Sequence, residues 1–407
     1  MVEEKFNQQQ ISNLFRNGLT LRYDPSQKTL LPTLTSNDFT SNTSPKISLI
    51  KENLTNSIKK QLFDFKSKNI AIALSAGLDS SLILGLLRNT KPNLKINAIS
   101  IKFAESNDET IAAKKIADFF EAEHQVIHLE NYFLELPSAI GIIGLPFWDI
   151  HWYYIAKTAN KKSEYLASGD GGDELFGGYT FRYSKFLSLI KPDSTSVDKV
   201  KAYLSCHERD WVTDQEKLFG KKSDFSWDSI YSVFLPFFNN SLSPLNQVFL
   251  ADYNGKLLYN FSKISNKINN FFNLKPITPI LEPELIRYAS HLSSVSKYDD
   301  TKNIGKLPLR KLFSQFNADS LIPSGKYGFS VNTINLWNSF GKELCNSFLD
   351  NARIIEDGWI NKDWISSHIN QPNLDVRYVN KFLGLLAFEI WYRIFITKEM
   401  NPKTKLS

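Results

Sequence analysis

The sequence predicts an α/β protein, a parallel and doubly wound sheet with an additional C-terminal all-α region. Two observations support this prediction. Between residues 46 and 185, short apolar runs alternate with segments of helical spacing, and polar Gly-containing segments directly follow two of the runs. Beyond about residue 180 the strand signal fades, and the remaining chain, rich in Phe, Leu and Tyr, indicates helices.

The first 45 residues are polar, rich in Ser, Thr and Asn, and interrupted by Pro25, Pro32 and Pro45. We expect an arm or a small cap here, since the segment is too short to be a catalytic domain. A helix is expected next, because apolar side chains recur every three or four positions at Ile47, Ile50, Leu54, Ile58 and Leu62.

A buried parallel strand is predicted at Ile70–Leu74, a short apolar run between polar residues and a Gly-containing turn. Because strands that alternate with helices imply right-handed crossovers, the whole stretch indicates a parallel sheet. The further strands are expected at residues 96–103, 125–129 and 164–168, and the helices between them at 82–87 and 108–120.

Three regions are therefore expected: the arm at 1–45, an α/β core at 46–185 and a helical region at 186–407. The net charge of +6, without a basic block, does not call for nucleic-acid binding. The chain has two cysteines, Cys206 and Cys345, which lie far apart in the sequence without CxxC spacing. This cysteine usage fits a reducing compartment. No signal peptide and no membrane-length apolar run is evident, so we expect a cytoplasmic protein without membrane contact.

The segment Ser75–Ser81 lies between the first predicted strand and a helix, where open α/β sheets bind ligands. Gly77 permits close backbone approach to an anion, and the hydroxyl of Ser80 and the helix N–H groups can bind phosphate oxygens. Asp79 fits this site if it holds Mg²⁺. The alternative is that Asp79 and Ser80 merely cap the helix. The segment matches neither a Walker A loop nor the G-x-G-x-x-G fingerprint.

The segment Ser168–Tyr179 follows the fourth predicted strand and holds five glycines and three carboxylates in twelve residues. This composition costs too much backbone entropy for an ordinary turn with solvated acids, which is the alternative interpretation. In a doubly wound sheet the segment can lie beside Ser75–Ser81. Asp173 could then be the second carboxylate that holds the Mg²⁺ ion.

Together, the two segments resemble the synthetase domain of asparagine synthetase B and its relatives, which are N-type ATP pyrophosphatases. The resemblance implies a sheet of the adenine-nucleotide alpha-hydrolase (PP-loop) type and covers roughly residues 47–400. Further matches to the family are Asn107–Glu109, Pro279–Glu282, Leu309–Lys311, Lys326–Ser330 and Glu389–Arg393.

The resemblance implies that ATP adenylates a carboxylate with release of pyrophosphate and that an amine then displaces AMP. Lys326 and Asp170 match the family's catalytic positions, although a solvated surface lysine is the alternative for Lys326. ATP and Mg²⁺ are the implied cofactors, with Asp79 and Asp173 as metal ligands. The implied ATP-binding residues are Leu74, Ser75, Gly77, Asp79, Ser80, Ile101, Ser168 and Gly169.

Three departures from the family pattern qualify this assignment. The chain begins Met1-Val2, without the family's N-terminal cysteine nucleophile, so we expect nitrogen from free ammonia, a substrate amine or a separate glutaminase subunit. Ala76 replaces a glycine, which strains the backbone only if its φ is positive. Ile277 stands where an arginine is typical, which puts aspartate as the acceptor in doubt.

The leading hypothesis is an ATP-dependent, amide-forming ligase that acts on a small carboxylate, with aspartate as the first candidate. An enzyme that amidates or cyclises another acid or a peptide remains an alternative. A catalytically inactive ATP-binding regulator is less consistent with the retained Asp79, Asp173 and Lys326. Other N-type pyrophosphatases share the first segment but lack the second.

Overall fold

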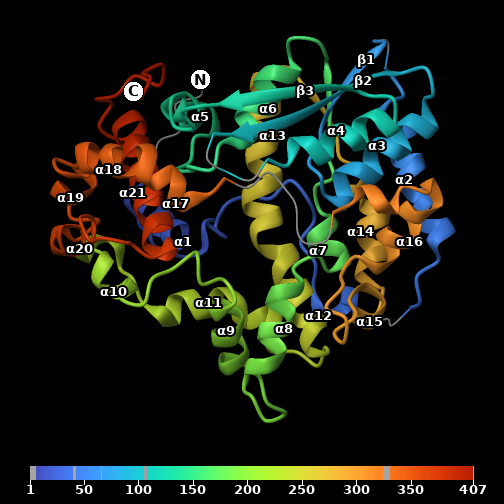
Figure 1. Ribbon diagram of the computed structural model, residues 1–407. Coiled ribbons are helices and arrows are strands. Elements are labelled where there is room, and N and C mark those ends of the chain that lie inside the picture. The colour runs from blue at the N-terminus through green and yellow to red at the C-terminus, as the bar shows by residue number, and fades with distance from the viewer. Residues whose placement is uncertain are drawn as a thin grey trace.

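The computed structural model describes residues 6–39, 43–65, 67–104, 106, 108–323 and 331–406. Its centre is a five-stranded parallel sheet in the order β3-β2-β1-β4-β5, with helices on both faces (Figure 1). The strands are β1 (Asn69–Ala73), β2 (Lys95–Phe103), β3 (Glu123–Leu129), β4 (Tyr165–Ala167) and β5 (Lys275–Ile277).

The direction of winding reverses between β1 and β4. From β1 the chain passes through α3 (Leu78–Thr90) and α4 (Thr110–Phe119), which contact β1, β2 and β3. It then returns through α6 (His151–Ala159), which contacts β1 to β4 and leads to β4 on the other side of β1. The predicted doubly wound sheet is therefore confirmed. The loops after β1 and β4 emerge side by side, where such sheets bind ligands.

β1 is apolar throughout because both of its faces are covered: Ile70 to Leu74 are almost completely inaccessible to solvent. The side chains of Ile70, Ile72 and Leu74 face a core shared with α2 (Ile47–Gln61), α3, α4, α14 (Pro283–Ser290) and α16 (Leu307–Phe313). Ala71 and Ala73 face the opposite core, which α6, α13 (Ser262–Phe271) and the C-terminal helices complete.

β5 was not predicted, since the region after residue 185 was expected to contain only helices. It pairs in parallel with β4, and the Ser168 N–H extends the pairing by donating to the Ile277 carbonyl at 3.0 Å. A three-residue strand is too short to show an alternating pattern. Pro276 also argues against a strand in the sequence, but it is tolerated because β5 is the edge of the sheet.

The N-terminal segment belongs to the main core. Its helix α1 (Gln8–Leu21) lies beside the long C-terminal helix α21 (Val376–Phe395), as Figure 1 shows. Phe15 of α1 is fully buried, with its ring stacked on Trp359 at 5.2 Å and 4.6 Å from the Phe388 ring. Within the expected arm, Gln8–Leu21 therefore form a helix that packs on the core.

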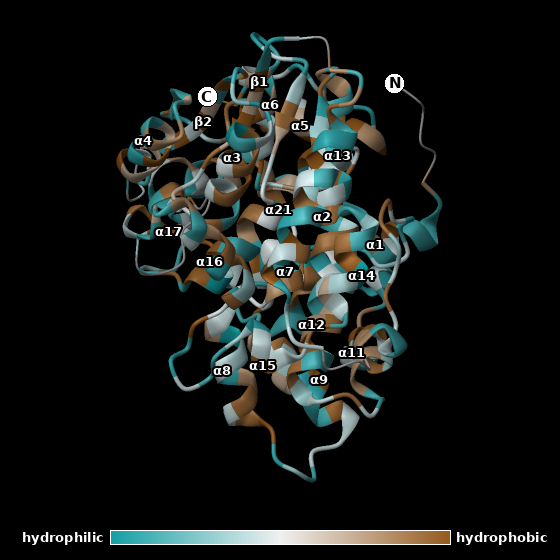
Figure 2. Cartoon of the chain, turned by 90° about the vertical axis from the view of Figure 1, so that its right-hand side faces the viewer, coloured by the Kyte–Doolittle hydropathy of each residue, from teal (hydrophilic) through white to brown (hydrophobic). Residues whose placement is uncertain are grey.

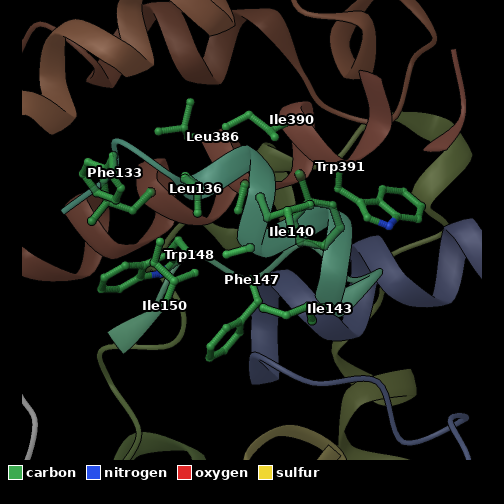
Figure 3. Packing of buried hydrophobic residues seen from close by; sticks show 14 of the residues in the cluster. Phe133, Leu136, Ile140, Ile143, Phe147, Trp148, Ile150, Leu386, Ile390 and Trp391 are labelled. Atoms are coloured by element: carbon green, nitrogen blue, oxygen red, sulfur yellow. The ribbon is translucent and has the colours of Figure 1, made fainter. Parts of the chain in front are cut away.

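Helix α5 (Leu136–Ile143) covers the same C-terminal helix from another side. In Figure 3 the side chains of Leu136 and Ile140 lie near Leu386 and Ile390 of α21. The Trp391 indole N–H donates to the carbonyl of Gly144, which ends α5, at 3.1 Å. These contacts fix the segment after α5, which holds Phe147 and Trp148.

A third group of helices lies at the end of the molecule opposite the sheet (Figure 2). It is formed by α8 (Thr180–Leu189), α9 (Ser196–Ser205), α11 (Trp227–Phe238) and α12 (Pro244–Asp252). Across the described residues, no helix has the length and apolar character needed to cross a membrane. The remaining α-helices are α7 (Gly172–Phe176), α10 (Gln215–Leu218), α15 (Ser294–Lys297), α17 (Thr333–Leu336), α18 (Lys342–Leu349), α19 (Arg353–Glu356) and α20 (Lys362–His368).

Candidate active site

The two predicted Gly-rich segments meet at the carboxyl ends of β1 and β4. The closest approach is at Gly172, where a Cβ atom would lie 2.4 Å from the Asp79 Cγ. No residue other than glycine fits there without moving Asp79. The glycine content of the second segment therefore has a direct structural reason, and the alternative of an ordinary turn with solvated acids is wrong at this position.

Hydroxyl groups hold the first loop in a tight turn. Ser75 and Ser80 approach each other with their Oγ atoms 3.1 Å apart, and the Gly77 N–H donates to the Ser75 hydroxyl at 3.1 Å. Gly77 is the N-cap of α3 and makes no side-chain capping bond, so the helix-capping alternative for Asp79 and Ser80 is wrong. Ala76 is not among the described residues with a positive φ, and this departure therefore adds no left-handed strain.

Asp79 and Asp173 converge on the ammonium group of Lys306. The Lys306 Nζ lies 2.5 Å from Asp79 Oδ2 and 2.7 Å from Asp173 Oδ1. Burial alone would lower the pKa of Lys306, but the charges of Asp173 and Asp79 outweigh it and raise that pKa above its ordinary value. Lys306 itself was not predicted. A signal was present in the sequence, since Gly305-Lys306 stands just before the Leu309–Lys311 match.

The structure brings together the two carboxylates that were predicted to hold Mg²⁺. Both carboxylates contact the same cation, the ammonium group of Lys306. Mg²⁺ sites commonly combine one or two carboxylates with phosphate oxygens. Asp173 packs closely against Gly178, where a Cβ atom would lie 1.8 Å from Asp173 Oδ1. The position of the Asp173 side chain therefore requires a glycine at residue 178. Among the described residues, no group of three or more His, Cys, Asp or Glu side chains is placed to hold a metal ion.

Glu174, beside Asp173, is a buried acid with a hydrogen-bond partner. The Tyr179 hydroxyl donates to Glu174 Oε1 at 2.5 Å. Burial, with a further contribution from the charge of Asp173, raises the pKa of Glu174 to about 7. The Tyr179 ring also stacks under the guanidinium of Arg182, whose Cζ lies 3.6 Å from the ring centre. These contacts hold the second loop rigidly against α8.

Asp170 lies in the same hollow as the first loop. The Ser168 hydroxyl donates to Asp170 Oδ2 at 2.8 Å. Burial raises the pKa of Asp170, while the Ser168 hydrogen bond and the charge of His151 act in the opposite direction. Asp170 is thus a positioned carboxylate whose affinity for a proton is increased.

The hollow between the two loops is a cavity of about 450 Å³. Segments far apart in the sequence complete its wall, and sequence reasoning missed them because no local pattern marks them. Those from outside the two loops include Arg22, Phe147, Asp149, His151, Trp152, Arg182, Lys256, Leu257, Asn260, Phe261, Ile264 and Ser265. Lys256 and Asn260 come from the segment Tyr253–Phe261, which is kinked at Gly255 and joins α12 to α13.

The other predicted residues differ in how they relate to this cavity. Ser168 and Gly169 line the cavity, whereas Leu74 and Ile101 do not. The Leu74 N–H donates to Ile99 at 2.8 Å and its carbonyl accepts from the Ser100 hydroxyl at 2.7 Å, so β2 already engages both groups. Adenosine binding by Leu74 and Ile101 stays a prediction. Lys326 lies outside the described residues, and so does Asn107.

Comparisons with known proteins identify a family. A family model described as asparagine synthase matches residues 49–393. Asparagine synthetase [glutamine-hydrolyzing] 1 of Bacillus subtilis is 26% identical over 368 residues, covering 81% of this chain and 57% of the relative. A putative asparagine synthetase [glutamine-hydrolyzing] of Mycobacterium tuberculosis is 25% identical over 371 residues, covering 81% and 55%. The chain thus spans little more than half the length of these relatives.

Solved structures show a more distant likeness. NMN synthetase from Francisella tularensis has 14% identity and a TM-score of 0.27, covering 56% of this chain and 93% of that one. NH3-dependent NAD synthetase from Campylobacter jejuni has 15% identity and a TM-score of 0.26, covering 49% and 99%.

Proposed function

This chain belongs to the asparagine synthase family, and we propose that it is an ATP-dependent, amide-forming ligase. In the proposed reaction a carboxylate oxygen attacks the α-phosphorus of ATP, pyrophosphate leaves, and ammonia or an amine displaces AMP from the acyl-adenylate. L-aspartate is our first candidate for the acid. The observation that carries the proposal is the convergence of Asp79 and Asp173 on one cationic point beside a cavity that contains Asp170.

On the phosphate side, the chain offers hydroxyl and N–H groups where charge develops as pyrophosphate leaves. Ser75, Gly77 and Ser80 lie in the tight turn that opens α3, and a helix N-terminus favours anions. Asp79 and Asp173 would hold Mg²⁺, which when bound neutralises charge on the departing pyrophosphate. Lys306 balances the two carboxylates with its own charge.

On the acceptor side, Asp170 and Lys326 are the proposed catalytic residues. An attacking amine must lose a proton as the amide forms, and a buried carboxylate with a raised pKa is suited to accept one. Ser168 orients Asp170 for that role. We assign Lys326 to the charge around the α-phosphate on the strength of the family motif alone.

The nitrogen source is proposed to be ammonia, an amine on the substrate, or ammonia delivered by a separate glutaminase subunit. Ammonium chloride and L-glutamine, compared as nitrogen donors with the isolated chain, test this assignment. We expect amide formation with ammonium and none with glutamine. Turnover of glutamine by the isolated chain would contradict it.

A second candidate function is ligation of an acid other than aspartate. It is favoured by Ile277, which fills the position of the family's typical arginine. In the structure this side chain is fully buried in β5, and its carbonyl is bonded to the Ser168 N–H. Isoleucine offers no cation at this position, so a cationic clamp for the acid would have to come from another residue.

The test is formation of AMP and pyrophosphate from ATP and Mg²⁺ with L-aspartate and ammonium chloride. We expect both products only when the acid is present, with a loss of at least about 100-fold in Asp79→Asn, as for removal of a group that stabilises charge in the transition state. Asp118→Asn is the matched control, because Asp118 is an exposed acid on α4 that forms an ion pair with Lys114. Products with another acid but not with aspartate would select the second candidate. Binding of ATP without cleavage, for every acid tried, would reject both.

A further inference from the structure

The N-terminal segment contributes a cation to the cavity from outside the residues that the family model matches. Arg22 directly follows α1 and lines the cavity that also contains Asp170 and the phosphate loop. We infer that Arg22 and Asp149 form a binding subsite for the α-carboxylate and α-ammonium groups of an amino-acid acceptor. This inference rests on the function proposed above, which requires a place for the acid beside ATP.

The backbone of Arg22 is fixed from two sides. It adopts a left-handed conformation with φ of 64°, its N–H donates to the Gly18 carbonyl at 3.1 Å, and its carbonyl accepts from the buried Asn260 side chain at 2.9 Å. The guanidinium lies over aromatic rings, with Cζ 5.3 Å from the Trp148 ring centre and 5.9 Å from that of Phe147. Figure 3 shows these two rings below α5. The side chain is therefore held in place by stacking.

The hydrogen-bonding capacity of the Arg22 guanidinium is still available for a ligand. Its carboxylate neighbour is Asp149, but the Arg22 Nη2 to Asp149 Oδ2 distance is 3.7 Å, too long for a hydrogen bond. In the part of the chain that the structure describes, no other acceptor bonds this guanidinium, and 28% of the side chain is exposed. A planar guanidinium with unused N–H groups is suited to a bidentate contact with a carboxylate.

Asp149 is an ionised acid with one oxygen directed to Arg22. Its Oδ1 accepts from the Tyr132 hydroxyl at 2.8 Å and lies 2.9 Å from His151 Nδ1. Burial alone would raise the pKa of Asp149, but the charges of His151 and Arg22 and these hydrogen bonds together lower it to about 2. The negative charge is retained at neutral pH, and Oδ2 remains for an ammonium group.

The other cations of the described cavity wall are already closely paired. Arg182 bonds Asp252 at 3.2 Å, and Lys256 bonds Asp210 at 2.5 Å. Arg22 has the longest of these ion-pair distances, so it is the cation best placed to take a carboxylate from a ligand. Because Asp149 lies beside Arg22, the two side chains together match a ligand that carries both a carboxylate and an ammonium group, rather than a carboxylate alone.

The subsite also offers a replacement for the arginine that is typical of the family at the position of Ile277. If the side-chain carboxylate of the acceptor faces ATP, its α-groups must be recognised elsewhere in the cavity. Arg22 supplies the guanidinium that position 277 lacks, from a different segment of the chain. An amino acid that carries a second carboxylate, such as L-aspartate, satisfies both requirements.

The experiment compares three probes that differ by one group: L-aspartate, succinate, which lacks the ammonium, and β-alanine, which lacks the α-carboxylate. Their Kd values are measured calorimetrically on the full chain with Mg²⁺ and a non-hydrolysable ATP analogue. For Arg22→Met we expect Kd to rise about 10- to 100-fold for aspartate and succinate but not for β-alanine. For Asp149→Asn we expect the same rise for aspartate and β-alanine but not for succinate.

Arg16→Met is the matched control, since Arg16 lies on the same helix α1 and contacts Asn13 and Asp224 outside the cavity. Arg22→Lys keeps the charge without the planar fork, and we expect a smaller loss from it. Equal effects of both variants on all three probes, or no effect, would overturn the subsite, and so would absence of aspartate binding to the wild type. The expected pattern without any AMP formation would leave the subsite standing and reject the proposed ligase activity.

Discussion

Replacement of Lys306 by methionine removes the cation that Asp79 and Asp173 share. The side chain keeps nearly the same volume, so the main change is electrostatic. Lys306 is well buried, with 14% of its side chain exposed, and it lies 2.5 Å and 2.7 Å from the two carboxylate oxygens. Without it, two acids that repel each other remain at the junction of the two loops.

The expected loss of stability is about 3–5 kcal/mol in the absence of Mg²⁺, the typical cost of removing one partner of a buried ion pair. For 407 residues the entropy of unfolding is about 0.85 kcal/mol/K, so the apparent Tm should fall by about 4–6 °C. Addition of Mg²⁺ and an ATP analogue should restore more of the stability in the variant than in the wild type. In the variant, the metal would replace the positive charge that Lys306 places between the two acids.

The assay is thermal unfolding in EDTA and in Mg²⁺ with the analogue, for the wild type and for Lys306→Met. Lys114→Met is the control, because the exposed pair of Lys114 with Asp118 on α4 should contribute at most about 0.5 kcal/mol. A variant as stable as the wild type in EDTA would refute the ion-pair reasoning. Equal stabilisation of both proteins by Mg²⁺ would refute the assignment of the two acids as metal ligands.

Three further predictions follow from the packing. Gly172→Ala places a Cβ atom 2.4 Å from the Asp79 Cγ, so ATP binding measured by calorimetry should weaken at least about 10-fold, and unchanged affinity would contradict the close contact. Phe15→Ala should lower the free energy of unfolding, measured in urea, by about 3–5 kcal/mol because Phe15 is fully buried. A nearly unchanged free energy of unfolding would mean that α1 is not part of the core. Burial lowers the pKa of Lys381 to about 7, so between pH 7 and about 10 the unfolded chain binds one more proton at this residue. The free energy of unfolding of the wild type, relative to that of Lys381→Met, should therefore rise with pH across this window by up to about 1.4 kcal/mol per pH unit. The measurement is the difference between their urea midpoints at each pH. A difference that stays flat or falls with pH would refute the prediction.

The parts of the fold that could be predicted are those in which one local pattern decides the structure. The apolar run at Ile70–Leu74 indicated a strand covered on both faces, and β1 is Asn69–Ala73. The strand expected at 96–103 is β2, Lys95–Phe103. The two Gly-rich segments could be placed side by side because alternating strands and helices imply a doubly wound sheet.

The parts that could not be predicted depend on contacts between distant segments. β5 has three residues and contains a proline, so neither its length nor its composition distinguishes it from a loop. Arg22 and Asp149 reach the cavity because α1 and α5 pack on α21, and no spacing in the sequence shows that packing. Lys306 is intermediate: its place before the Leu309–Lys311 match was visible, but its contact with both acids was not.

The central claim is that the carboxylate of the acceptor attacks the α-phosphorus of ATP at the site formed by the two loops. The most direct measurement uses L-aspartate labelled with ¹⁸O in its carboxylates, with ATP, Mg²⁺ and ammonium, and mass spectrometry of the nucleotide products. When ammonia displaces AMP, the attacking oxygen stays on phosphorus, so we predict AMP that carries one ¹⁸O atom. Label in inorganic phosphate together with ADP, or AMP without label, would contradict the account.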